Sequence, residues 1–130
     1  MRVRRLSEAH VEERGRLRSH FLMDAGDLGS RKMSVTWVDV APGAEQHAHS
    51  HEDSEQIYVI VRGRGRMQVA GDEEEVGEGD LVFIPPATDH GVVNDGDETL
   101  VYVTAASPPV SMEELYQEQL APDGLDYDED

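Results

Sequence analysis

The sequence predicts an all-β protein, a sandwich or a barrel of short strands. Three observations lead to this prediction: apolar residues alternate with polar ones in short runs, turn-forming residues separate the runs, and almost no helical pattern lies between them. A parallel sheet needs crossover connections of a dozen or more residues, and the intervals between these runs are shorter. We therefore expect antiparallel pairing throughout this part of the chain.

The first predicted strand begins at Met33, where apolar residues recur at every second position, and it ends at the turn Ala41-Pro42-Gly43. Glycine, proline, asparagine and aspartate fill the later breaks, as in Gly63-Arg64-Gly65 and Pro85-Pro86, because these residues supply the backbone angles of turns. The remaining strands are predicted over residues 45–51, 56–62, 65–70, 73–76, 81–84, 90–93 and 99–105.

Segments with other patterns flank the predicted strands. Ser7 is placed to cap a short N-terminal helix, and Asp24–Ser30 has the composition of a loop. Ser111 and Glu114 form a capping-box pattern that predicts a short helix near residues 112–120. The expected organisation is an N-terminal extension (1–32), a β domain (33–107), a short C-terminal helical segment (108–122) and a disordered acidic tail (123–130).

Size and composition favour one soluble domain. The chain has 130 residues, of which 38% are hydrophobic and 30% charged, enough for one core but not for two domains. No apolar stretch approaches the ~20 residues that span a bilayer, and no apolar segment follows the N-terminal arginines as it would in a secretory signal. Without cysteine, disulfides and thiolate chemistry are excluded. We expect a cytoplasmic protein with no membrane partner.

The charge balance is strongly acidic. Eleven basic residues against 28 acidic ones give a formal net charge of −17, and such a surface repels phosphate backbones, so no nucleic-acid partner is expected. Repulsion between these acidic side chains should destabilise the folded state at low ionic strength, and salt should screen it. We therefore expect a halophilic host with a salty cytoplasm. The alternative is a mesophilic protein with acidic ends, since residues 123–130 alone carry five acids.

Three histidines at alternate positions, His47, His49 and His51, stand in the predicted strand 45–51. Side chains alternate between the faces of a strand, so we expect these three imidazoles on one face. Imidazoles with an oxygen donor nearby suit a divalent transition metal. The alternative is a polar surface strand. His90, just past the Pro85-Pro86 loop, reads by itself equally well as an ordinary loop histidine.

Together the two histidine stretches resemble the two motifs of the cupin family. In the first, Gly43 is followed by five residues, His49-Ser50-His51, four residues, Gln56, six residues and Gly63. The second motif falls on Gly79, Pro85, Ala87, His90 and Asn94, with Ala87 where the family has glycine. The fifteen residues from 64 to 78 match the short spacer of small microbial members.

The resemblance implies a double-stranded β-helix, a small jelly-roll barrel, with a metal held by His49, His51, Gln56 and His90. The family usually has glutamate where this chain has Gln56. A neutral amide oxygen would leave roughly two positive charges at the site instead of one, which weakens metal binding and favours an anionic ligand. Glu55 fits a looser form of the motif and remains a second choice, and Glu52 a weaker one, although strand alternation puts Glu55 opposite Gln56.

The resemblance also implies a cofactor and a range of functions. Iron, manganese, nickel, zinc and cobalt all suit the donor set. We expect a metalloenzyme acting on a small organic molecule by dioxygenase, isomerase or lyase chemistry, with His47 as a candidate acid–base group and with Met67, Phe83, Tyr58 and Tyr102 lining the barrel. The alternatives are a non-catalytic module that binds or senses a small ligand or metal, and a structural protein. A homodimer is expected by resemblance.

Overall fold

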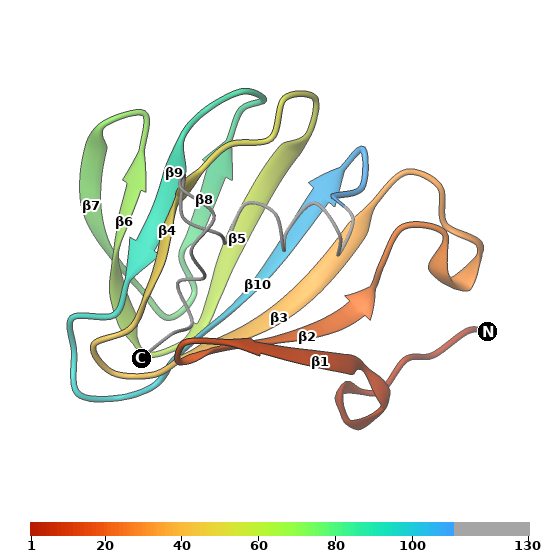
Figure 1. The fold of residues 1–130 in the computed structure, drawn as a ribbon, viewed down its shortest axis with the longest axis horizontal. Helices are drawn as coiled ribbons and strands as arrows, with labels where there is room; N and C mark the ends of the chain where they lie inside the picture. Colours follow the sequence, from red (N-terminus) through yellow and green to blue (C-terminus); the bar gives the residue numbers. More distant parts are fainter. Residues whose placement is uncertain (111–130) are drawn as a thin grey trace.

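The computed structural model describes residues 1–110 and contains two antiparallel sheets that face each other (Figure 1). In sheet order, the six-stranded sheet comprises β1 (His10–Arg14), β2 (Leu17–Met23), β3 (Ser34–Val40), β10 (Leu100–Ser107), β5 (Glu55–Arg62) and β8 (Leu81–Ile84). The four-stranded sheet comprises β4 (Glu45–His49), β9 (His90–Val93), β6 (Arg64–Val69) and β7 (Asp72–Gly77). The predicted all-β architecture is therefore confirmed.

Each strand predicted between residues 33 and 105 is present, with bounds that shift by a few residues. The largest difference concerns the strand predicted over residues 45–51, because β4 ends at His49 and leaves His51 in the following loop. Every pairing in both sheets is antiparallel, as the short connections require.

The N-terminal helix predicted at Ser7 is wrong. Leu6–Glu8 form one 3-10 turn with Ser7 inside it, and β1 and β2 then make a hairpin whose second strand pairs with β3. A second 3-10 turn, Asp27–Gly29, lies in the predicted loop. The physical reason is a period of two: Leu17 and Phe21 are buried on one face of β2, with Arg18 and His20 on the other. The predicted C-terminal helix lies outside the described residues.

The interior between the sheets changes from apolar to polar along the strands. Cross-strand pairing sets Tyr102 between Val38 and Ile60, and these three side chains are buried in the core. Each such side chain contributes roughly 1.5–3 kcal/mol on burial. One inward position further along, the same register aligns the more polar groups Thr36, Thr104 and Tyr58, and the next aligns Ser34, Ala106 and Gln56. The polar end is where a site can form.

Two motif residues fix the loops at the apolar end. Gly63 has a φ of +82°, and a Cβ there would lie 2.6 Å from the Thr99 carbonyl oxygen. Asn94 is fully buried: its Nδ2 donates to the carbonyl oxygens of Val40 and Glu98, and its Oδ1 accepts from the Gly96 amide. These contacts explain both residues without a role in chemistry. None of the described helices is long and apolar enough to span a membrane.

Candidate metal centre

Three histidines meet inside the sandwich. His49 ends β4, His51 follows in the loop, and His90 begins β9 directly opposite His49 in the strand register. One nitrogen from each ring lies within 4.8 Å of the other two. His51 and His90 are buried and His49 is half-buried. These three residues are called the histidine cluster below.

A β-bulge in β4 turns His49 inward. Gln46 pairs with Val92 and His49 pairs with His90, so β4 uses three residues where β9 uses two. One extra residue reverses the alternation of faces, and Gln46 and His49 therefore both point between the sheets. Gly91 makes room for the bulge, because a Cβ at that position would lie 2.8 Å from the Gln46 carbonyl oxygen and 3.1 Å from the Ala48 amide nitrogen.

The same bulge separates His47 from the histidine cluster, and the prediction of one shared face is wrong in this respect. His47 lies on the same side of β4 as Glu45, with its Nδ1 3.2 Å from Glu45 Oε1 and its side chain 40% exposed. The sequence rule assumed a regular strand through His51, whereas the bulge precedes His49 and the strand ends there.

Backbone carbonyl groups orient two of the imidazoles. His49 Nδ1 lies 2.8 Å from the His47 carbonyl oxygen, and His90 Nδ1 lies 2.9 Å from the Thr88 carbonyl oxygen. A carbonyl only accepts, so each Nδ1 carries the proton and donates it, which leaves Nε2 with a lone pair. His90 Nε2 is buried and has no hydrogen-bond partner among the described residues, an arrangement typical of a metal ligand.

Burial keeps His90 neutral. Desolvation lowers the pKa of His90 below its ordinary value of 6.5; the hydrogen bond to Thr88 opposes this shift, and the proximity of His51 adds to it. A metal ligand must be unprotonated, so the environment of His90 favours the form that binds a metal near neutral pH.

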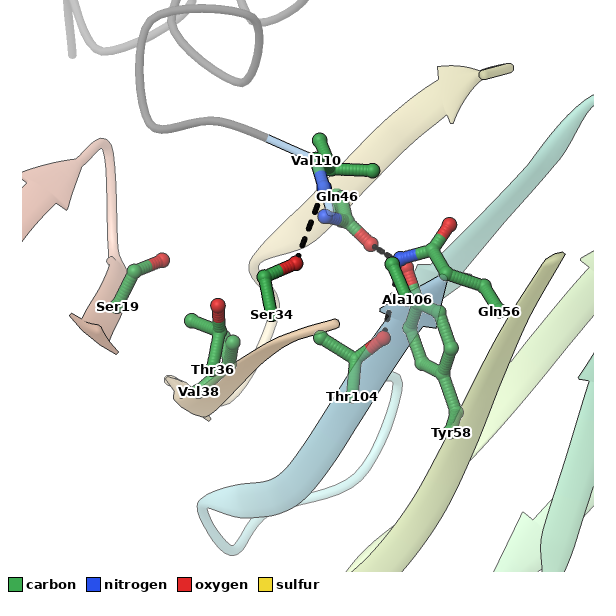
Figure 2. A pocket seen from close by; sticks show the side chains of 10 residues that line it. All are labelled: Ser19, Ser34, Thr36, Val38, Gln46, Gln56, Tyr58, Thr104, Ala106 and Val110. Carbon is green, nitrogen blue, oxygen red and sulfur yellow. Dashed lines mark hydrogen bonds between the residues drawn. The ribbon is translucent and has the colours of Figure 1, made fainter. Parts of the chain in front are cut away.

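Gln56 stands at the inner side of β5 with only 5% of its surface exposed, whereas Glu55 and Glu52 are exposed. Its Nε2 donates a 3.0 Å hydrogen bond to Thr104 Oγ1, and the oxygen points away from Thr104 (Figure 2). Gln56 Oε1 is buried without a hydrogen-bond partner among the described residues. Burying such an oxygen costs about 1–3 kcal/mol unless it finds a partner, which is a reason to expect a cation or a ligand beside it.

The loop that carries the second motif also supports His51. The Ala87 amide donates a 2.7 Å hydrogen bond to the His51 carbonyl oxygen. Ala87 adopts a φ of +58°, a left-handed conformation that costs a non-glycine residue roughly 1–2 kcal/mol. The family's glycine at this position would avoid that cost.

The donor set fits a divalent transition metal. Three neutral imidazole nitrogens, with the Gln56 oxygen as a further donor to test, suit iron, manganese, cobalt, nickel or zinc, and leave positions on an octahedral ion for exchangeable ligands.

The sequence missed one polar residue of the interior, Gln46. Its Oε1 accepts hydrogen bonds from Tyr58 Oη at 2.7 Å and Tyr102 Oη at 3.2 Å. Only the bulge makes Gln46 an inward residue, and no sequence signal marked the bulge. Tyr58, Tyr102 and Met67 line the interior as expected, but Phe83 does not: it is 51% exposed on the outer face of β8.

The fold and the histidine cluster define a small β-barrel protein with a candidate metal centre. The sequence model of the cupin domain family matches residues 36–106, more than half of the chain. This chain therefore belongs to the cupin domain family, as its two motifs predicted.

Curated relatives share the motif region. An uncharacterised protein of Methanocaldococcus jannaschii is 37% identical over 83 residues, 64% of this chain and 66% of its own length. The glucose-6-phosphate isomerase of Pyrococcus abyssi is 34% identical over 62 residues, 44% of this chain and 33% of its own. The matches thus span two thirds or less of the curated relatives.

The fold recurs in solved structures. A predicted oxalate decarboxylase from Thermotoga maritima superposes with a TM-score of 0.75 at 21% sequence identity, and the match covers 82% of this chain and 98% of the other. A likeness at this level of identity concerns the fold alone.

Proposed function

We propose that this protein is a metal-dependent enzyme that acts on a small organic molecule. The observation that carries the proposal is the histidine cluster. Its three inward-facing rings come from β4, the next loop and β9, and one nitrogen of each ring lies within 4.8 Å of a nitrogen of the other two. The core beneath the histidine cluster is already apolar, so packing of the sheets does not require three imidazoles at this place.

The residues of the cluster have distinct tasks in this proposal. A divalent metal bound there would polarise a substrate oxygen and stabilise negative charge that develops on it. His49, His51 and His90 hold the metal, and backbone carbonyl groups fix the ring orientations of His49 and His90 beforehand. Gln56 adds a neutral oxygen. We assign no proton transfer to His47, since its side chain lies outside with Glu45.

Isomerase chemistry is the reaction class that we favour among isomerase, lyase and dioxygenase. The support is the 34% identity to the Pyrococcus abyssi glucose-6-phosphate isomerase over the motif region. Isomerisation of a hydroxy aldehyde to a hydroxy ketone requires polarisation of two adjacent oxygens, which an open divalent site supplies.

The test is a screen of small hydroxy aldehydes and hydroxy acids with protein loaded with each candidate metal. We expect turnover that disappears in the double variant His49→Ala/His90→Ala and persists in His47→Ala, the matched control on the other face of β4. Turnover that survives in the double variant contradicts the proposed centre.

A non-catalytic binding module is the alternative, and Gln56 is the observation that favours it. A neutral residue at the usual glutamate position lowers the affinity for a metal, as expected if a catalytic centre had been lost. Metal-loaded protein that binds a small ligand reversibly, with no turnover of it under any metal, would support this alternative.

We also propose a homodimer that forms through the outer face of the six-stranded sheet. The strand register aligns eight apolar side chains across β8, β5, β10 and β3; the eight are Leu81, Val59, Val103, Trp37, Phe83, Ile57, Ala105 and Val35. Leu81 and Phe83 are 58% and 51% exposed. In a chain of net charge −17, two copies can approach most easily where no charged side chain intervenes.

Sedimentation velocity measures whether the protein is a dimer in solution. We expect a dimer that dissociates in Leu81→Asp/Phe83→Asp and remains in Val3→Asp, which changes a similarly exposed apolar residue elsewhere. If the wild-type protein is a monomer, or if the Leu81→Asp/Phe83→Asp variant remains a dimer, the outer face of the six-stranded sheet is not a dimer interface.

A further inference from the structure

A narrow pocket lies at the polar end of the interior, and Figure 2 shows the side chains that line it. Tyr58 lines the pocket and also packs edge-on against His90, with 5.8 Å between the ring centroids. The pocket therefore shares a wall with the candidate metal centre. Its polar groups are hydroxyls and amides of β2, β3, β10, β5 and β4, and they include Ser19, Thr36, Thr104, Gln46 and Gln56.

None of the side chains that line this pocket carries a charge. An anionic group such as a phosphate needs a cationic side chain or a cluster of backbone amides to replace its hydration, and this lining supplies neither an arginine nor a lysine. In the same neighbourhood, the neutral donors of the candidate metal centre would leave the charge of a divalent ion uncompensated. We therefore expect the negatively charged group of a ligand to bind at the metal and its uncharged part to bind in the pocket.

Several polar groups of the pocket are placed to hydrogen-bond a hydroxyl. The two tyrosine hydroxyls hold the Gln46 oxygen, which leaves the Gln46 amide nitrogen as a donor. Thr36 is 7% exposed, and no hydrogen bond joins its hydroxyl or that of Ser19 to another described residue. Hydroxyls both donate and accept, so this set suits a ligand hydroxyl better than a purely accepting group.

The pocket is also small. The space open to the centre of a water molecule is about 20 Å³, enough for one or two waters. Val110 closes one side, where its amide donates a 3.0 Å hydrogen bond to Ser34 Oγ. A hydroxymethyl arm can replace such waters, whereas a phosphate cannot enter without displacing the walls.

We propose that the pocket binds the uncharged, hydroxylated arm of a small hydroxy acid whose carboxylate end ligates the metal. This inference rests on the proposed metal centre and not on the isomerase reaction class, and of the hydroxy aldehydes and hydroxy acids in the screen it selects the hydroxy acids. It separates the protein from an enzyme for phosphorylated sugars, even though three curated relatives carry the name glucose-6-phosphate isomerase.

The test compares three ligands with the same metal-binding end on cobalt-loaded protein. Glycerate carries a terminal hydroxyl, lactate lacks it, and 3-phosphoglycerate replaces it with a phosphate ester. Binding is followed by calorimetry and by the cobalt absorption spectrum, so no turnover is needed. We expect glycerate to bind about three- to tenfold more tightly than lactate, the effect of one net hydrogen bond, and 3-phosphoglycerate to bind more weakly than either.

Thr36→Val tests the pocket itself, because it removes one hydroxyl and preserves the side-chain shape. We expect it to reduce the preference for glycerate over lactate, and we expect Thr99→Val, a change at an exposed threonine, to preserve that preference. Equal binding of glycerate and lactate to wild-type protein, or tighter binding of 3-phosphoglycerate than of glycerate, would overturn the assignment of the pocket and leave the proposed metal centre intact. A cobalt titration carried out beforehand tests the metal centre itself. If the protein takes up no cobalt, both the metal centre and the assignment of the pocket are overturned.

Discussion

Gln56 is the residue at which this chain departs from the first cupin motif, and its environment makes the effect of a charge testable. Its oxygen is buried without a hydrogen-bond partner among the described residues, while Thr104 holds its nitrogen. Gln56→Glu replaces the neutral oxygen with a carboxylate beside the candidate metal position. We expect about tenfold tighter binding of a divalent metal, which corresponds to ~1.4 kcal/mol, as measured by calorimetry.

Glu55→Gln provides the matched control for that change, because residue 55 is exposed on the opposite face of β5. We expect it to leave the metal affinity unchanged. If Glu55→Gln weakened metal binding and Gln56→Glu had no effect, the oxygen donor would be Glu55.

Ala87 tests the strain in the loop that supports His51. Ala87→Gly removes the cost of a left-handed conformation, roughly 1–2 kcal/mol, and adds about 0.4–1 kcal/mol of unfolded-state entropy. We expect a net gain of ~0.5 kcal/mol in the free energy of unfolding, measured by urea denaturation. Ala105→Gly in the middle of β10 should instead lose about 0.5–1 kcal/mol; a loss of similar size at both positions would show that the φ of Ala87 carries no strain.

At the scale of elements, the bulge in β4 decides which histidines enter the cluster. Gly91→Ala would place a Cβ 2.8 Å from the Gln46 carbonyl oxygen and push the bulge away from β9. We expect the metal affinity to fall by at least about tenfold, or ~1.4 kcal/mol, since His49 and His90 must remain opposite each other. Circular dichroism should show that the sheets persist.

Gly96→Ala is the control for the glycine substitution. Gly96 has a negative or extended backbone φ, and the atom nearest to a Cβ there is Asn94 Oδ1 at 3.5 Å, an ordinary contact. Its metal affinity should equal that of the wild type. Wild-type affinity in Gly91→Ala would mean that the bulge does not position His49.

The sequence predicted elements better than it predicted side-chain directions. Turn residues and a period of two located the strands from residue 33 to 105, and the spacing of two motifs pointed to His49, His51 and His90 before any geometry was known. His47 left the face predicted for it, and Gln46 entered the interior unpredicted, because a bulge adds one residue without a sequence signal. The N-terminal hairpin was missed because charged residues at outward positions hid the buried pair Leu17 and Phe21.

At the scale of the whole molecule, the net charge of −17 opposes folding. Four acidic residues, Asp72 to Glu75, follow one another along β7, and all are exposed. Raising KCl from about 0.1 to 1 M shortens the Debye length from ~10 to ~3 Å, so we expect stability to rise. A gain of ~1 kcal/mol corresponds to an increase in Tm of about 4 °C, which differential scanning calorimetry resolves.

A variant with less charge checks the cause of that salt dependence. Glu73→Gln/Glu74→Gln removes two of the adjacent charges, and we expect it to be more stable than the wild type at low salt and to gain less from added KCl. A Tm that is equal in dilute buffer and in 1 M KCl would favour a mesophilic protein whose acidity lies at its ends over a halophilic one.

Elemental analysis of protein purified without a polyhistidine tag shows whether the histidine cluster holds a divalent metal. We predict close to one equivalent of a divalent transition metal in the wild type and in His47→Ala, and a loss of nearly all of it in His49→Ala/His90→Ala. A wild-type protein that contains no metal and fails to take up any on dialysis against iron, manganese, cobalt, nickel or zinc would mean that the histidine cluster is not a metal centre.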